Sequence, residues 1–223
     1  MTHSVPRIES VNVGVLCVLP GVRNAQPTGI VKRPVAGPVR VDRDGLEGDH
    51  IGSVRDHGGP DQAVYVFSSE DYAWWEESLQ RRLEPGIFGE NLTVSGWDPV
   101  AARVGDLWEI DGLRLELSGP RIPCATLAAR MGIPTLVKRF AQANRGGAYA
   151  RVLHPGTVWA GAAVEVVQAG EENPKIHELF ALWHQKEKSL ELIRRALASP
   201  VAWRARIDLE RWRSRLEGAG RCG

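Results

Sequence analysis

Cys124 is the side chain whose surroundings point most directly to chemistry. It closes residues 118–124 (SGPRIPC), which follow an alternating apolar segment and precede an apolar helical pattern. Unpaired N–H groups at the start of a helix favour thiolate over thiol, and the guanidinium of Arg121 acts in the same direction. Thiolate is the form of cysteine that binds a soft metal ion or attacks an electrophile. The alternative is a buried cysteine that only fills space.

His57 opens a second candidate segment, residues 57–61 (HGGPD), just before an apolar run. The adjacent Gly58 and Gly59 allow a backbone to come close to a bound group, and an imidazole can donate to an anion or an oxo ligand. The alternative is a turn in which His57 is merely exposed. His50 is a weaker candidate for the same role.

Basic and amide side chains near glycines or strand ends form a third group, and its members are Lys32, Asn91, Arg145 and Arg151. Asn91 offers a donor and an acceptor for a heterocycle edge or a phosphate. If the fold brings the basic residues together they would bind phosphate, arginine bidentately. Taken singly, each charge is most often a solvated surface residue and the asparagine a turn residue.

The composition argues against several classes of protein. The 223 residues include 28 Lys and Arg and 27 Asp and Glu, so the net charge of +1 lacks the basic surplus of a nucleic-acid-binding protein. The apolar residues 13–19 (VGVLCVL) are too few to span a bilayer and lack the flanks of a signal peptide. The 3 widely spaced cysteines do not suit a secreted disulfide framework. We therefore expect a soluble, cytoplasmic protein with no nucleic-acid or membrane partner.

Motifs of common cofactor sites are missing from the sequence. It contains no G-x-G-x-x-G or P-loop pattern, no H-E-x-x-H and no paired C-x-x-C. Dispersed cysteines cannot supply the ligands of a common iron–sulfur cluster. The sequence therefore shows no electron carrier of its own.

Short strands and turns characterise the first 170 residues. Apolar runs predict strands at residues 11–18, 63–67, 113–117 and 163–167. One helix is expected from the capping-box residue Ser68 to about Leu83, and another from Cys124 towards Ala143 with a break at Pro134. These elements predict an α+β fold, with a mostly-β, barrel-like domain and peripheral helices.

Residues 171–217 contain no glycine, although the chain holds 24, and this predicts a helical segment. Amphipathic helices are expected after Asn173-Pro174, around residues 190–197 and after Ser199-Pro200. We therefore divide the chain into a barrel-like domain at residues 1–170 and a C-terminal three-helix extension at residues 171–223. An extension of this size is marginal as an independent core, so it should pack on the first domain, and its helices are compatible with a homodimer contact.

A series of short motifs, in this order, resembles the MOSC domain family, the fold shared with the C-terminal part of molybdenum cofactor sulfurases, and most closely its YiiM-like branch. The motifs are residues 28–35 (TGIVKRPV), 45–49 (GLEGD), 57–65 (HGGPDQAVY), 89–93 (GENLT), 105–106 (GD), 120–124 (PRIPC), 145–149 (RGGAY) and 151–153 (RVL). Residues 171–217 resemble the three-helix extension of the same branch.

The resemblance implies a molybdenum cofactor (molybdopterin carrying molybdenum) with Cys124 as the protein ligand to the metal. It also implies reduction of N-hydroxylated purine bases and amidoxime-like N–O substrates, with electrons from a separate flavin or iron–sulfur reductase. The catalytic residues expected on this basis are Cys124, His57 and Arg121. The expected cofactor-binding residues are Lys32, His57, Gly58, Gly59, Asn91, Arg121, Arg145 and Arg151.

Two other hypotheses remain open from the sequence. In one, the protein binds and delivers the cofactor or sulfur without turnover, and Cys124 accepts a persulfide. In the other, a cofactor-free barrel presents its three helices to a partner protein.

Overall fold

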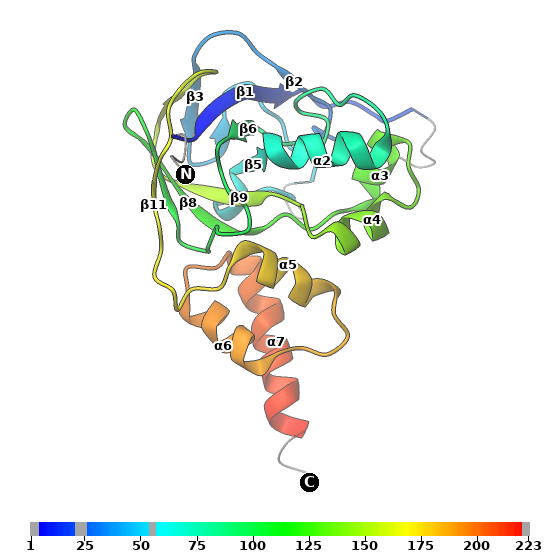
Figure 1. The fold of residues 1–223 in the computed structure, drawn as a ribbon, viewed down its shortest axis with the longest axis vertical. Coiled ribbons are helices and arrows are strands. Elements are labelled where there is room, and N and C mark those ends of the chain that lie inside the picture. The colour runs from blue at the N-terminus through cyan, green and yellow to red at the C-terminus, as the bar shows by residue number, and fades with distance from the viewer. Residues whose placement is uncertain (1–4, 21–25, 54–56, 220–223) are drawn as a thin grey trace.

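In the computed structural model, which describes residues 5–20, 26–53 and 57–219, a curled sheet with peripheral helices lies against a separate group of helices (Figure 1). The larger sheet contains eight strands in the order β11-β7-β8-β9-β5-β6-β1-β2. Its strands are β1 (Arg7–Gly14), β2 (Lys32–Pro34), β5 (Val64–Ser68), β6 (Leu92–Ser95), β7 (Leu107–Ile110), β8 (Leu113–Pro120), β9 (Ala148–His154) and β11 (Glu165–Val167). A smaller sheet has the order β10-β3-β4, from β3 (Val39–Asp42), β4 (Gly45–Leu46) and β10 (Gly156–Val158). The mixed α+β class expected from the sequence is therefore confirmed.

The larger sheet curls towards a barrel without forming one. In the described part of the chain, its end strands β11 and β2 do not pair with each other. The residues before β11 nevertheless return to β1, because Val164 N donates to Pro6 O at 2.8 Å and Ile8 N donates to Ala162 O at 2.9 Å. The result is a barrel-like but open wall around one core.

Strand β5 separates two hydrophobic cores because successive side chains point to opposite faces of a sheet. Val64 and Val66 face the core enclosed by the curled sheet, whereas Tyr65 and Phe67 face an aromatic core beneath the helices. All its residues are buried, so the strand expected at residues 63–67 is confirmed. The strands expected at 113–117 and 163–167 correspond to β8 and β11.

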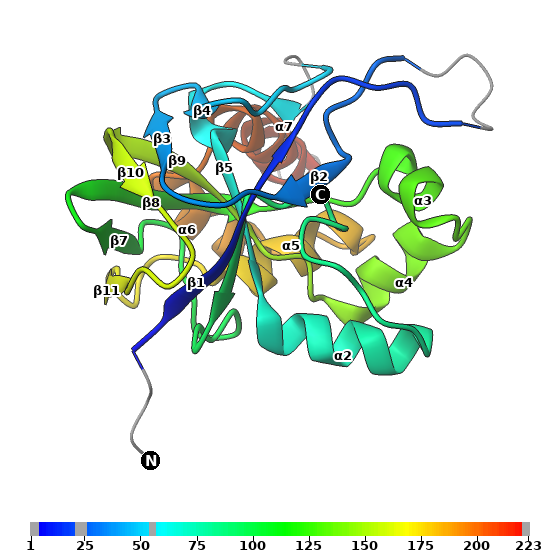
Figure 2. The ribbon, with the colours of Figure 1, turned by 90° about the horizontal axis from the view of Figure 1, so that it is seen from above.

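Three helices cover the aromatic core: α2 (Ser69–Leu79), α3 (Ala125–Met131) and α4 (Leu136–Ala143), which lie together along one side of the sheet (Figure 2). The Ser68 hydroxyl caps α2 by accepting from the N–H groups of Glu70 and Asp71. The helix ends at Leu79 rather than near Leu83, because Gln80 adopts a left-handed conformation with φ of 53°. Cys124 caps α3, and the expected break near Pro134 separates α3 from α4.

The strand expected at residues 11–18 is wrong in its second half, because β1 ends at Gly14. Beyond it Val15, Leu16 and Val18 are exposed, so the apolar run does not mark a buried strand there. Cys17 is half-buried, with Sγ 3.7 Å from Thr28 O, rather than part of a core.

Three C-terminal helices follow β11: α5 (Ile176–His184), α6 (Leu190–Ala198) and α7 (Trp203–Ala219). Helix α5 starts later than Asn173-Pro174 suggests, because the backbone there bonds to the turn before β7: Val104 N donates to Pro174 O at 3.0 Å. Helix α7 begins only at Trp203, whose N–H donates to Asp61 Oδ2 at 2.6 Å. Among the described helices, none combines the length and apolar character needed to cross a membrane.

The C-terminal helices share the core enclosed by the sheet, although the division at residue 170 remains a prediction. Ile176, Leu179, Ile193 and Leu209 belong to the same buried cluster as the strand residues. Unfolding of the helices should therefore be coupled to unfolding of the sheet.

Truncation of Leu209 tests this coupling. Leu209 is fully buried, so Leu209→Ala should lower the free energy of unfolding by about 2–5 kcal/mol in a single transition followed by both circular dichroism and tryptophan fluorescence. Leu216→Ala, on the same helix at a side chain 37% exposed, should change it far less. An early transition of the helices alone, with the sheet unaffected, would show that the extension folds separately.

Candidate functional site

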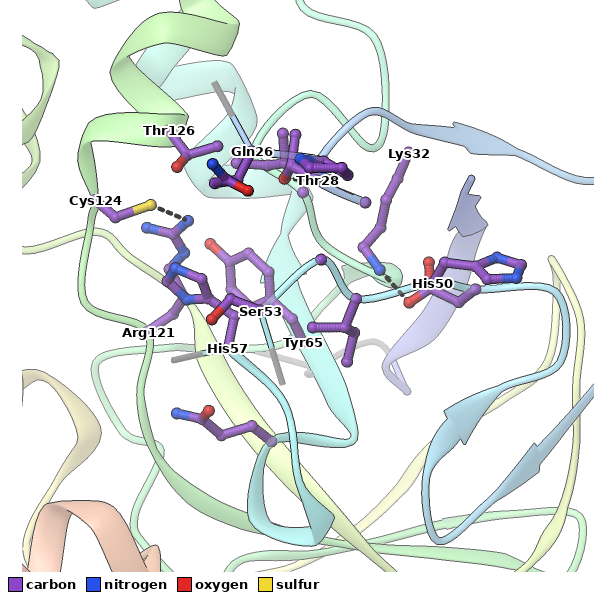
Figure 3. A pocket seen from close by; sticks show the side chains of 18 of the residues that line it. Gln26, Thr28, Lys32, His50, Ser53, His57, Tyr65, Arg121, Cys124 and Thr126 are labelled. Atoms are coloured by element: carbon purple, nitrogen blue, oxygen red, sulfur yellow. Dashed lines mark hydrogen bonds and ion pairs between the residues drawn. The ribbon is translucent and has the colours of Figure 1, made fainter. Parts of the chain in front are cut away.

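A cavity of about 460 Å³ opens between the sheet, the loop after β1 and the start of α3 (Figure 3). Cys124 and Arg121 lie at one end and Lys32 and His50 at the other, with Tyr65 between them (Figure 3). The volume is within the usual range for a small-molecule or cofactor site.

Cys124 reaches the cavity because β8 delivers the chain to the N-terminus of α3. The residue adopts an extended backbone (φ −128°, ψ 168°) as the cap of that helix. Pro123 precedes it, and a proline both limits the preceding backbone and lacks an N–H group. The half-buried thiol therefore stands beside the first N–H groups of α3.

The surroundings of Cys124 favour its ionised form. Burial alone would raise the pKa of the thiol, but a hydrogen bond with His57, the charge of Arg121 and the N–H of Leu127 together lower that pKa to about 6. Most of the thiol is therefore deprotonated at neutral pH, in agreement with the expectation from the sequence.

Arg121 holds a positive charge next to this sulfur although only 3% of the residue is exposed. Its Nη2 lies 3.8 Å from Cys124 Sγ and its Nη1 donates to Ile122 O at 3.0 Å. The guanidinium carbon lies 5.6 Å from the centre of the Tyr65 ring. Its buried Nε has no hydrogen-bond partner among the described residues. A buried donor without a partner is costly, so an acceptor in the cavity would complete the site.

His57 lines the cavity beside Cys124, but Gly58 and Gly59 are not among the described residues that line it. The two glycines form the turn into the short helix η1 (Pro60–Gln62), where Gly59 has φ of 97°. This left-handed backbone favours glycine. The structure therefore gives the glycines a role in placing His57 and brings no contact of theirs to the cavity.

Lys32 and Asn91 line the opposite end, and both bind Asp49. The ammonium of Lys32 pairs with Asp49 Oδ2, and Asn91 Nδ2 donates to the same oxygen at 2.9 Å. Asn91 Oδ1 accepts from Tyr65 N at 3.1 Å, which ties this group to β5. Burial lowers the pKa of Lys32, and the pair with Asp49 opposes that shift. The charge of Lys32 is thus balanced by a carboxylate.

Arg145 and Arg151 are not brought to the cavity. Arg145 pairs with Asp71 and stacks on Trp74, with 5.3 Å from the guanidinium carbon to the ring centre. Arg151 stands opposite Glu116 in the β8–β9 ladder, and it binds Glu116 at 2.7 Å and Asp61 at 2.9 Å. Their positions near glycines and strands did not reveal which way the side chains point. Through Asp61, Arg151 instead secures the turn that follows His57.

Several lining residues were missed by the sequence argument, chiefly Tyr65, Tyr149, Thr126, Ser53 and Thr28. Tyr65 and Tyr149 are paired residues on β5 and β9, and burial raises the pKa of both phenols. In the sequence, the only sign of these two tyrosines was that each lies between valines or alanines. It indicates a strand without indicating which face meets a cavity.

Comparison with known proteins identifies the family. A model of the MOSC domain matches residues 53–165, the segment that carries His57, Arg121 and Cys124. The chain belongs to the MOSC domain family. YflK of Bacillus subtilis is 38% identical over 181 residues, which is 80% of this chain and 82% of that protein.

Two further matches are a solved structure with a similar fold and a relative whose name refers to an activity. The crystal structure of YiiM from Geobacillus stearothermophilus has a TM-score of 0.78 and 27% identity, and the match covers 93% of this chain and 99% of that one. A protein of Gibberella moniliformis named "Reductase" is 31% identical over 147 residues, 63% of this MOSC protein but 26% of that relative. The YiiM-like architecture, C-terminal helices included, is therefore shared.

The ionisation of Cys124 gives a measurable prediction. In cofactor-free protein, the rate at which iodoacetamide alkylates Cys124 should rise with pH and reach half its maximum near pH 6, because thiolate is the reactive form. His57→Gln removes a hydrogen bond that lowers the pKa, so the midpoint should move upwards. Mass spectrometry of the Cys124 peptide measures the rate.

His50→Gln is the matched control, because His50 lines the same cavity but is not one of the groups that lower the pKa of Cys124. Its midpoint should stay with that of the unsubstituted protein. A midpoint near the ordinary thiol value of about 8.5 in the unsubstituted protein would contradict the electrostatic argument.

Proposed function

We propose that this MOSC protein is a molybdenum cofactor-dependent reductase of N-hydroxylated compounds, such as N-hydroxylated purine bases and amidoxime-like substrates. The observation that carries the proposal is a half-buried Cys124 thiol with a pKa of about 6, held at the wall of a 460 Å³ cavity next to Arg121. The relative named "Reductase" supports the same general chemistry.

The residues present fit the cofactor at its metal end. A thiolate is a suitable ligand for a soft or borderline metal, and the unpartnered Nε of Arg121 offers a donor to an acceptor bound beside it. In the described part of the chain, no group of three or more His, Cys, Asp or Glu side chains could hold a metal ion alone. A metal at Cys124 would therefore need to bring most of its ligands with it, as a metal held by a dithiolene does.

The opposite end of the cavity is less suited to binding the cofactor's phosphate than the sequence suggested. Lys32 is neutralised by Asp49, while Arg145 and Arg151 lie outside the cavity lining. The proposal for cofactor binding therefore rests on Cys124, Arg121, His57 and the Lys32–Asp49–Asn91 group. Bound there, the cofactor would supply the two-electron chemistry that the side chains lack.

The side chains around Cys124 would supply a proton for cleavage of the N–O bond. Reduction of an N-hydroxylated amine consumes two electrons and two protons, breaks the N–O bond and releases the amine and water. His57, which forms a hydrogen bond with the Cys124 sulfur, would deliver one proton as a general acid. We propose that a separate flavin or iron–sulfur reductase supplies the electrons.

A second candidate function follows from the same thiol. A cysteine with a lowered pKa is also a good nucleophile towards a donor persulfide. Transfer of the outer sulfur would leave Cys124 as a persulfide and the donor as a thiolate. A sulfur carrier of this kind would show the labelled persulfide without turnover of N-hydroxylated compounds.

Cys124→Ser tests the reductase. The protein is produced in a host that makes the cofactor, and molybdenum, pterin and anaerobic turnover of an N-hydroxylated base with a reduced dye are measured. The variant should lose turnover by about 1000-fold or more and most of its molybdenum, because the hydroxyl is a poor ligand for this metal at neutral pH.

Cys17→Ser is the matched control, since Cys17 is also a half-buried free cysteine but does not line the cavity. It should retain both molybdenum and turnover. Full activity and metal content in Cys124→Ser would remove Cys124 as the ligand, and a metal-free, inactive unsubstituted protein would remove the reductase itself.

A further inference from the structure

A second cavity, of about 300 Å³, reaches Cys124 from the side of the C-terminal helices. Four side chains line both cavities: His57, Gln62, Cys124 and Tyr149. They form the boundary between the two spaces, so Cys124 and His57 each contribute to the walls of both cavities.

The rest of the second cavity comes from both parts of the chain. The end of β8 and the turn after it supply residues such as Ser118 and Ile122, while α5 supplies Trp183 and α7 supplies Arg204 and Asp208. The residue just before α7 is tied to β8, because Ala202 N donates to Ser118 O at 2.9 Å. The C-terminal helices thus build one wall of a space that ends at Cys124.

We propose that this second cavity is the substrate chamber, and that it takes a planar, uncharged heterocycle, the free N-hydroxylated base rather than its phosphorylated nucleotide. The inference rests on the proposed function of the first cavity. A molecule in the second cavity reaches Cys124 and His57 without displacing a group bound in the first.

The apolar lining suits a flat ring. Trp183 presents an aromatic side chain, and it is held edge-to-face against Trp212 with ring centres 5.0 Å apart. Pro120 and Pro123 lie on the sheet side of the chamber, so rigid apolar groups line both sides. The volume is at the lower end of small-molecule sites, as expected for one small ring system.

The polar lining suits a neutral molecule that both donates and accepts. Arg204 Nη1 donates to Gln62 Oε1 at 3.0 Å, which links the guanidinium to the boundary beside His57. Asp208 stands four residues further along α7 and accepts from Arg211 at 3.0 Å. The charges of Arg204 and Asp208 offset each other, so the lining offers a donor and an acceptor to a base edge without the positive surplus that a phosphate site needs.

Ala205→Trp tests the chamber, because Ala205 lines it and a tryptophan there would fill it. Binding of an N-hydroxylated purine base to cofactor-free protein, measured by isothermal titration calorimetry, should weaken by about tenfold or more. In molybdenum-loaded protein, kcat/KM for the same base should fall by a similar factor while the molybdenum content stays at the level of the unsubstituted protein.

Ile207→Trp is the matched control on the same helix, at an exposed residue that does not line the chamber. Its binding and kcat/KM should remain within about twofold of the unsubstituted protein. Unchanged binding and kcat/KM in a folded Ala205→Trp protein would overturn the chamber. So would the absence of any binding of the base to the unsubstituted protein.

The ligand class is tested without altering the chamber. The unsubstituted cofactor-free protein should bind the base at least about tenfold more tightly than the corresponding nucleoside 5′-monophosphate. Asp208→Asn should narrow that difference, because a negative charge is removed. Equal or tighter binding of the monophosphate would overturn the neutral-ligand assignment.

The failure of the proposed function looks different from the failure of the chamber. If molybdenum-loaded protein reduces no N-hydroxylated compound, the proposed reductase activity is wrong. Binding of the base to Ala205→Trp protein still tests whether the second cavity holds the substrate. If turnover proceeds and Ala205→Trp leaves kcat/KM unchanged, only the chamber fails.

Discussion

A deprotonated sulfur beside a buried guanidinium is the interaction on which the candidate site depends. Removal of either charge from water is unfavourable, and each lowers the cost of the other because they lie 3.8 Å apart. Arg121 is held there by a backbone carbonyl and by the face of Tyr65, so its position does not depend on a ligand. The thiolate is therefore a property of the folded chain, present before anything binds.

Three adjacent strands of the sheet, β5, β9 and β8, position Arg121 and Cys124 next to each other. Alternation along β5 and β9 directs small aliphatic side chains into the enclosed core and directs Tyr65 and Tyr149 towards Arg121. Strand β8 then runs directly into residues 121–124, and Gly119, with φ of 156°, lies near a register shift between β8 and β9. Core packing and the placement of the charged groups are thus consequences of the same three adjacent strands.

Sequence patterns predicted the elements better than the directions of individual side chains. The helix cap at Cys124, the buried strand at β5 and the glycine-free helices follow from local rules, because caps, alternation and glycine content act over a few residues. The sequence did not reveal that Arg145 and Arg151 point away from the cavity, because their partners, Asp71 and Asp61, lie 74 and 90 residues away in the sequence. The strand predicted at residues 11–18 was too long because the apolar pattern continues past Gly14, where the backbone leaves the sheet.

Asp61 connects the C-terminal helices to the sheet. Asp61 accepts from the N–H that starts α7 and also binds Arg151, and its own backbone carbonyl accepts from Ser118. The turn after His57, the end of β8 and the start of α7 are therefore tied to one residue. A shift of α7 would move His57 relative to Cys124, because the same carboxylate holds both segments. Packing of the extension thus fixes the geometry on the side of Cys124 that faces the second cavity, and a MOSC domain without it would leave that side of Cys124 open to water.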